Sequence, residues 1–127
     1  MQYAILCYNC EDQVFAWDRG HEDKVMAGLR AVQEPLAKKG KLGPVARLMP
    51  TTAATTLRKD QDPPLVIDGP FAETKEQLLG FYVLNVDTLD EALAIAKDLG
   101  KANPGGAFEI RPILTFADHT LTKETTI

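Results

Sequence analysis

Two short apolar segments, Gln2–Tyr8 and Leu79–Val86, constrain the fold of this 127-residue chain more than any other feature. Both are rich in aromatic and branched side chains, and both are apolar at odd and even positions alike. That pattern is typical of a strand that is covered on both of its faces. Helices that pack on one face of a sheet leave the other face open. We therefore expect a second copy of the chain to cover that face, sheet against sheet, with two-fold symmetry.

Two further segments have the periodicity of helices. From about His21 to Gly40, apolar residues recur in steps of three and four, and Pro35 predicts a kink or break in this helix. The segment Thr88–Leu99 predicts a second helix, with Thr88 and Glu91 forming a capping box and Gly100 ending it. The predicted buried stripe of the second helix comprises Leu89, Ala92, Leu93, Ala96 and Leu99.

The remaining strands complete the order of elements. Segments with strand character are Leu42–Met49, Ala54–Arg58, Leu65–Ile67 and Phe108–Leu114. The order is strand, helix, strand pair with a small extension, strand, helix, strand. This is the split βαβ order of a ferredoxin-like α+β fold, with an antiparallel sheet and two helices on one face.

Composition indicates a single globular domain, which we place at residues 1–116, followed by a threonine-rich tail at 117–127. The chain is 45% hydrophobic and 25% charged. Its formal net charge of −4 argues against a nucleic-acid-binding protein, which needs a basic surface. Met1–Tyr8 lacks the basic start of a signal peptide, and no apolar stretch approaches the ~20 residues of a membrane span. We expect a cytoplasmic protein that binds neither nucleic acid nor membranes.

Metal and cofactor sites have little support in the sequence. Cys7 and Cys10 form a lone C-x-x-C, but Cys7 lies inside a strand, so we interpret the pair as two reduced cysteines. The carboxylates of Asp60, Asp62 and Asp68 do not have the spacing of a calcium loop. The chain also lacks a phosphate-binding glycine loop and a nucleophile elbow. We expect no metal and no cofactor.

The stretch Asp68-Gly69-Pro70-Phe71 is a chain reversal by its chemistry. Pro70 fixes its own φ, Gly69 tolerates angles closed to other residues, and the Asp68 side chain can accept bonds from following amides. Phe71 is expected to return the chain to the core. Turn chemistry alone explains all four residues.

The longer run from Asp68 to Tyr82, DGPFAETKEQLLGFY, resembles the signature of the YCII-related family, in the branch named for its Asp-Gly-Pro-Phe motif. The resemblance continues through Asp90–Leu93 and Phe108–Ile113, and spans Met1 to about Leu114. It implies a dimeric α+β barrel of ferredoxin-like subunits and no settled activity. Some members of the wider family have been proposed as enzymes with a His–Asp pair in a cleft. Asp68 would match that aspartate, with His21 as its partner.

Other polar residues are candidates for a ligand site. Alternation in the last strand places Glu109 and Arg111 on one face, away from the helices if Phe108 faces them. The pair either braces the interface, alone or with Lys75, or faces a ligand. Arg111, together with Arg47, could hold a carboxylate or phosphate. Tyr82 either lines the barrel or presents its hydroxyl to a cleft, and Phe71, Glu73 and Lys75 flank the turn.

Three functions fit these features. The first is a dimeric small-molecule binding or sensing module, with a polar cleft around the turn and a small organic or acidic ligand. The second is a cofactor-free enzyme in which Asp68 orients His21 for proton transfer on a small organic acid. The third is an interaction partner of a transcription regulator, which follows only from the family's frequent location near alternative sigma factor genes.

Overall fold

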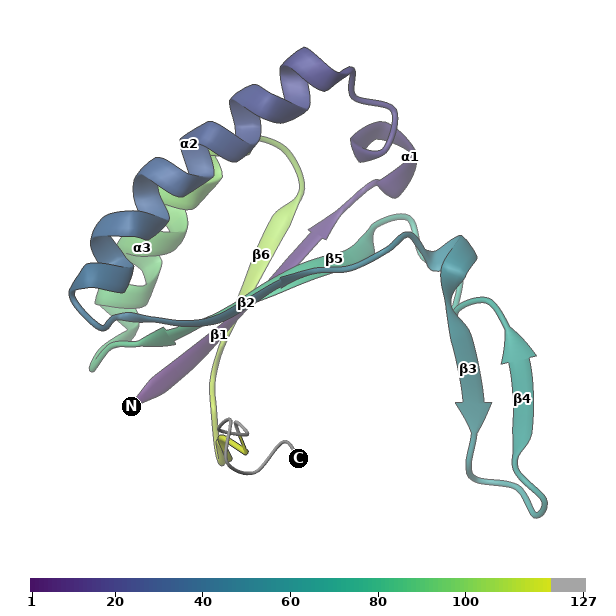
Figure 1. The fold of residues 1–127 in the computed structure, drawn as a ribbon. Coiled ribbons are helices and arrows are strands. Elements are labelled where there is room, and N and C mark those ends of the chain that lie inside the picture. Colours follow the sequence, from purple (N-terminus) through teal and green to yellow (C-terminus); the bar gives the residue numbers. More distant parts are fainter. Residues whose placement is uncertain (120–127) are drawn as a thin grey trace, which may run out of the picture.

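A four-stranded antiparallel sheet with strand order β2-β5-β1-β6 forms the centre of the molecule (Figure 1). The computed structural model describes residues 1–119. The sheet strands are β1 (Gln2–Asn9), β2 (Leu42–Arg47), β5 (Gln77–Asn85) and β6 (Ala107–Pro112). Helices α2 (Arg19–Lys38) and α3 (Leu89–Ala102) both lie on one face of this sheet (Figure 1). The predicted ferredoxin-like α+β fold is confirmed.

The core lies between the two helices and the sheet. Ile5 pairs with Tyr82 and Tyr3 with Leu84 across β1 and β5, so these four side chains share the face under the helices. The side chains of Ile5, Leu84 and Leu99 are completely buried. At this scale of burial, each large aliphatic side chain stabilises the fold by about 1.5–3 kcal/mol.

The helices differ from expectation in three details. Helix α2 continues through Pro35 to Lys38 without a break, although the proline has no N–H to donate to the helix. Helix α3 continues past Gly100 to Ala102, since Gly100 does not adopt the positive φ of a terminating glycine. Its buried stripe includes Ile95, whereas Leu89 and Leu93 are exposed.

The α3 cap is partly as predicted. The Thr88 hydroxyl accepts a hydrogen bond from the Glu91 N–H at 3.2 Å. The Glu91 carboxylate, however, pairs with the Lys41 ammonium, and this pairing lowers the pKa of Glu91. The Glu91 side chain therefore links the first turn of α3 to Lys41, the residue before β2.

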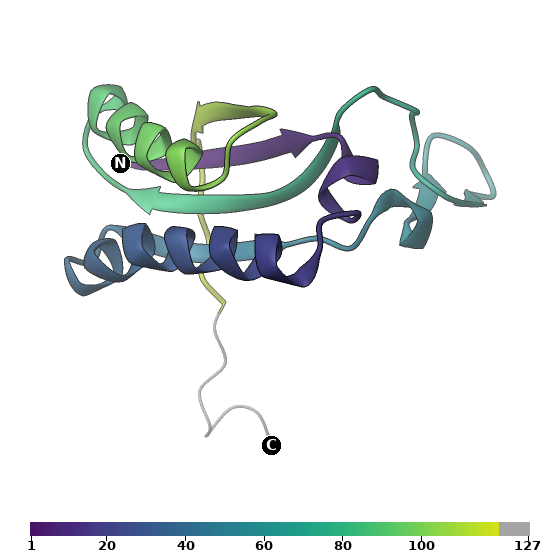
Figure 2. The ribbon, with the colours of Figure 1, turned by 90° about the horizontal axis from the view of Figure 1, so that it is seen from above.

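A two-stranded hairpin of β3 (Thr55–Arg58) and β4 (Leu65–Asp68) projects beyond one end of the main sheet (Figures 1 and 2). In Figure 1 it points to the side away from the helices. The short helix α1 (Glu11–Val14) and the 3₁₀ turn η1 (Thr51–Ala53) lie near its base. They are connected through Glu11, whose carboxylate accepts the Thr51 N–H at 2.8 Å.

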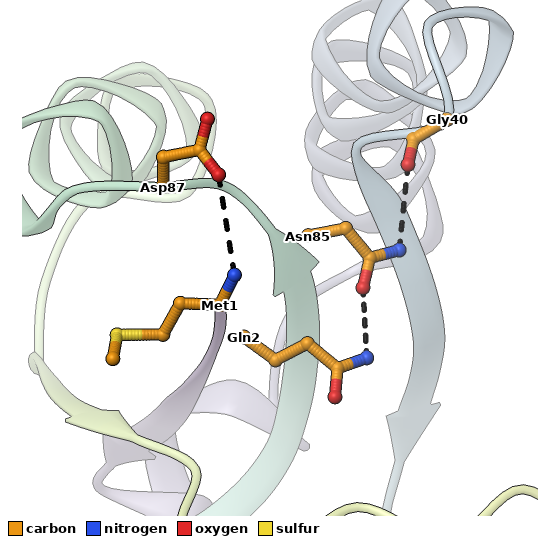
Figure 3. Close-up of polar contacts among 5 residues, drawn as sticks. All are labelled: Met1, Gln2, Gly40, Asn85 and Asp87. Carbon is orange, nitrogen blue, oxygen red and sulfur yellow. Dashed lines mark hydrogen bonds and ion pairs between the residues drawn. The ribbon is translucent and has the colours of Figure 1, made fainter.

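Polar contacts hold the opposite end of the sheet (Figure 3). The Gln2 amide donates to Asn85 Oδ1 at 2.8 Å, and Asn85 Nδ2 donates to the Gly40 carbonyl at 3.3 Å. The amino terminus of Met1 lies 4.0 Å from a carboxylate oxygen of Asp87. These contacts lie at the surface and join β1, β5 and the turn that follows α2.

Two sequence expectations concern regions outside the main layers. In the predicted tail at 117–127, residues 117–119 carry no helix or strand, and 120–127 lie outside the described residues. Within residues 1–119, no helix is both long enough and apolar enough to cross a membrane.

Candidate functional site

A cavity of about 130 Å³ lies between α2 and the sheet, at the end of the sheet opposite the contacts of Figure 3. Helix α2 contributes Val25, Met26, Leu29 and Gln33 at helical spacing. The far wall comes from the sheet face under α2, and the loop after α3 closes one side. The other main lining residues are Cys7, Val14, Trp17, Arg47, Gly80, Tyr82, Asn103, Gly105 and Phe108.

The cavity is mostly apolar, with a few polar groups on its wall. Cys7 pairs with Gly80 across β1 and β5, one step along the face from the pair of Ile5 and Tyr82. The Gln33 side chain lies beside the Tyr82 hydroxyl and favours its ionised form. Asn103 follows α3, and its Oδ1 is buried without a hydrogen-bond partner among residues 1–119. An apolar pocket with a small number of placed polar groups is the usual form of a small-molecule site.

Burial keeps the acidic groups of the cavity protonated. It raises the pKa of the Cys7 thiol to about 12. It also raises the pKa of Tyr82, an effect that the neighbouring Cys7 reinforces and the Gln33 side chain opposes. Both groups are neutral at pH 7. They can form hydrogen bonds with a ligand there, but Cys7 has too little thiolate to act as an ordinary nucleophile.

Arg47 lies at the edge of the cavity. Its guanidinium is 2.8 Å from the Glu22 carboxylate and 5.7 Å from the centre of the Phe15 ring. The arginine charge is thus already paired with an acid and placed over an aromatic ring. It is not directed at the interior as a free anion-binding group.

Glu109 and Arg111 lie on the opposite side of the sheet from this cavity. Phe108 and Ile110 pack against the core, which confirms the predicted alternation. The Arg111 Nε donates to the Glu109 carboxylate, and this bond raises the pKa of the arginine. Because Tyr82 faces the helices, one cleft within a single chain does not contain Tyr82 together with Glu109 and Arg111.

Asp68 ends β4 on the hairpin, which projects away from the helices (Figure 1). The residues that line the cavity do not include Asp68, Phe71, Glu73 or Lys75. Gly69 has φ +103°, as expected of this turn, and donates its N–H to the Ala54 carbonyl at 2.7 Å. Phe71 does not return to the core: it is 77% exposed. Its burial was expected because a large aromatic next to a turn usually packs inward, but here the turn belongs to a projecting arm. Glu73 and Lys75 are exposed as well.

Asp68 and His21 are not brought together within one chain. The Asp68 carboxylate makes no hydrogen bond to any residue of the described part of the chain. His21 is exposed in the first turn of α2, where its ring contacts Trp17 edge-on with centroids 4.8 Å apart. Trp17 lines the cavity, so His21 contacts a residue of the cavity wall but does not itself line the cavity.

Several cavity residues were not singled out from the sequence. Gln33 is four residues after Leu29 on the buried side of α2, and an amide within an apolar stripe is a usable signal. Cys7 continues the alternation of Tyr3 and Ile5 towards the helices. Asn103 was assigned only to a loop, and nothing in the local sequence indicates that its side chain turns inward. Among residues 1–119, no cluster of three or more His, Cys, Asp or Glu is arranged to hold a metal ion.

Comparisons with known proteins agree with the fold. A family model described as YCII-related domain matches residues 1–117. Uncharacterized protein R00369 of Rhizobium meliloti (strain 1021) is 55% identical over 117 residues, which cover 91% of this chain and 94% of the relative. A solved structure of 5-chloro-2-hydroxyhydroquinone dehydrochlorinase (TftG) from Burkholderia phenoliruptrix AC1100, in complex with 2,5-dihydroxybenzoquinone, is similar with a TM-score of 0.53. The match covers 89% of this chain and 93% of that chain at 16% identity, so it supports the fold alone.

Proposed function

The chain belongs to the YCII-related domain family, and we propose that it is a homodimeric small-molecule binding protein whose ligand occupies the cavity beneath α2. The observation that carries the proposal is an apolar cavity of about 130 Å³ with polar groups from Cys7, Gln33, Tyr82 and Asn103 on its wall. An engineered apolar cavity of about 150 Å³ in another protein binds benzene. The expected ligand is therefore a molecule with one small ring.

The structural neighbour itself binds a molecule with one ring. TftG is solved with 2,5-dihydroxybenzoquinone, a single hydroxylated ring. Simple phenols, which have a ring of the same size and are neutral at pH 7, are suitable first probes for this chain. The proposal relocates the predicted cleft from the Asp68 turn to the space between α2 and the sheet.

Filling the cavity tests the proposal. Val25→Phe places a larger side chain at a position that is 4% exposed and lines the cavity. We expect wild-type protein to show saturable thermal shifts and NMR chemical-shift changes with single-ring probes. Val25→Phe should weaken the binding by at least about tenfold, or 1.4 kcal/mol.

A matched control uses the same helix. Ala27 is exposed on α2, so Ala27→Phe adds an aromatic ring to the outer surface and should leave the affinity unchanged. Circular dichroism checks that both variants fold, and Leu29→Phe serves as a second filling variant if Val25→Phe does not. Equal binding by wild type and a folded cavity-filling variant would place the ligand elsewhere.

Two surfaces support the homodimer. Ala4, Leu6 and Phe81 lie half-buried on the face of the sheet opposite the helices, beside Val83, which is already buried within one chain. The hairpin exposes Leu57, Leu65, Val66 and Ile67, although an isolated two-stranded hairpin is marginally stable in water. A second sheet packed against the open face would cover its apolar residues and bring the two hairpins to the rim of the interface.

Light scattering tests the dimer. Leu6 lies opposite Phe81 on one side and Glu109 on the other. Leu6→Lys should therefore remain folded, with its new charge opposite Glu109, and convert a dimer of 13.9 kDa chains into a monomer. Leu93→Lys, on the exposed side of α3, is the control and should stay dimeric. A wild-type monomer at micromolar concentration would contradict this part of the proposal.

Catalysis is the second candidate function, favoured by the fact that the structural neighbour TftG is an enzyme. The cavity groups Cys7 and Tyr82 are protonated at neutral pH, so they would act as hydrogen-bond or proton donors. His21, close to the wall through Trp17, is the available base. Recovery of the probe after incubation separates the functions, because a binding protein returns it chemically unchanged.

A further inference from the structure

Asn103 occupies a defined position at the cavity wall. It follows the last turn of α3 with φ −134° and ψ 75°, and its N–H donates to the Leu99 carbonyl at 3.1 Å. The backbone thus leaves the helix at this residue while remaining bonded to it. Asn103 lines the cavity together with Gly105 and Phe108.

The loop after Asn103 is pressed against the end of β1. A Cβ on Gly106 would lie 2.1 Å from the Tyr8 carbonyl oxygen, and one on Gly105 would lie 3.7 Å from Asn9 Nδ2. Both glycines have positive φ, +94° for Gly105 and +73° for Gly106. Close approach of this loop to β1 holds the end of α3, and therefore Asn103, beside the cavity.

The polar side chains of the cavity wall differ in whether they already have a polar partner within the chain. The Tyr82 hydroxyl already has the Gln33 side chain beside it. The Cys7 thiol points its weak donor at the Ile5 carbonyl, 3.9 Å away. Asn103 Oδ1 is the buried side-chain oxygen for which residues 1–119 provide no donor. A buried amide oxygen without a donor is unfavourable, so each such atom in a native protein calls for a physical reason.

We infer that Asn103 Oδ1 selects the ligand of this cavity, by accepting a hydrogen bond from an O–H or N–H group carried on an apolar ring. The inference rests on the proposed function and adds its chemical class: phenols and aromatic amines rather than hydrocarbons, ethers or carboxylates. An amide oxygen repels an anion, and the arginine that lines the cavity, Arg47, is paired with Glu22. A site built to hydrogen-bond one group discriminates against the analogue that lacks it.

Phenol and toluene are matched probes, because they share the ring and differ in the donor. Isothermal titration or NMR titration of the full chain should give a Kd at least about tenfold lower for phenol than for toluene. Asn103→Leu keeps a side chain of similar size and removes the acceptor. In this variant the preference for phenol should disappear, chiefly through weaker binding of phenol.

Lys101→Leu is the control. Lys101 is exposed in the last turn of α3 and does not line the cavity, so this variant alters the same end of the helix and should preserve the preference. The ligand-free melting temperature gives an independent reading: Asn103→Leu should melt at the same temperature as wild type or higher, because it removes a buried acceptor without a donor. Asn103→Ala replaces it if the leucine variant does not fold.

The outcomes separate the two proposals. If wild type binds neither probe nor any other single-ring compound, the proposed function fails. If wild type binds both probes equally, or if a folded Asn103 variant retains the phenol preference, the cavity binds ligands but Asn103 does not select them. A lower melting temperature of the variant together with a retained preference would assign Asn103 a structural role, satisfied by water.

Discussion

Replacing Gly106 with alanine should destabilise the protein by about 2–5 kcal/mol. Two costs combine at this position. Gly106 has φ +73°, where a residue with a Cβ costs about 1–2 kcal/mol. The new Cβ would also lie 2.1 Å from the backbone oxygen of Tyr8, and relieving that overlap by moving the loop costs about 1–3 kcal/mol more.

Gly40→Ala separates these two costs. Gly40 has φ +70°, nearly the same as Gly106, but no atom lies within 4 Å of the position of its Cβ. Urea unfolding should therefore show only the conformational cost of about 1–2 kcal/mol for Gly40→Ala. Equal destabilisation of the two variants would mean that the contact between the loop and β1 is softer than the geometry indicates. It would also remove the argument that this contact holds Asn103 at the cavity.

Leu84→Ala should be the most destabilising single truncation in the sheet, at about 2–5 kcal/mol. Leu84 is completely buried and packs in the core formed by the sheet and both helices. The core cluster that contains Leu84 includes residues of β1, β5, α2 and α3, so the surrounding structure cannot close the space by moving one element. Thermal or urea unfolding, followed by circular dichroism at a fixed protein concentration, measures the change.

Leu89→Ala is the matched control for Leu84→Ala. Leu89 is 48% exposed in the first turn of α3, so the same truncation should cost about 1 kcal/mol or less. If Leu84→Ala costs no more than Leu89→Ala, the side chain of Leu84 is not in a closely packed core.

The sequence predicted the architecture well because the signals of this fold are local. Helical periodicity located α2 and α3, and the doubly apolar segments located β1 and β5. The predicted end of helix α3 was less accurate. Gly100 resembles a helix terminator by composition, but only its backbone angles decide that role, and in this part of the folded chain the glycines with positive φ are Gly105 and Gly106, which follow α3.

The candidate site was predicted less well, for a physical reason. Tyr82 lines the cavity, but the prediction grouped it with Glu109 and Arg111, which the sheet places on its other face. Successive residues of a strand point to opposite faces of the sheet. Two residues on different strands therefore share a face only if the pairing register places them so. That pairing register, with an irregularity between Cys7 and Tyr8, is a property of the assembled sheet.

The residues themselves thus determined the order of helices and strands, the ferredoxin-like topology and the apolar character of both faces of the central strands. These follow from side-chain periodicity and from turn residues within a few positions of each other. Only the tertiary structure decided that Cys7, Gln33, Tyr82 and Asn103 meet around one cavity and that Asp68 stands apart from His21. Such contacts join residues far apart in the chain, and they depend on how α2 and the α3–β6 loop pack on the sheet.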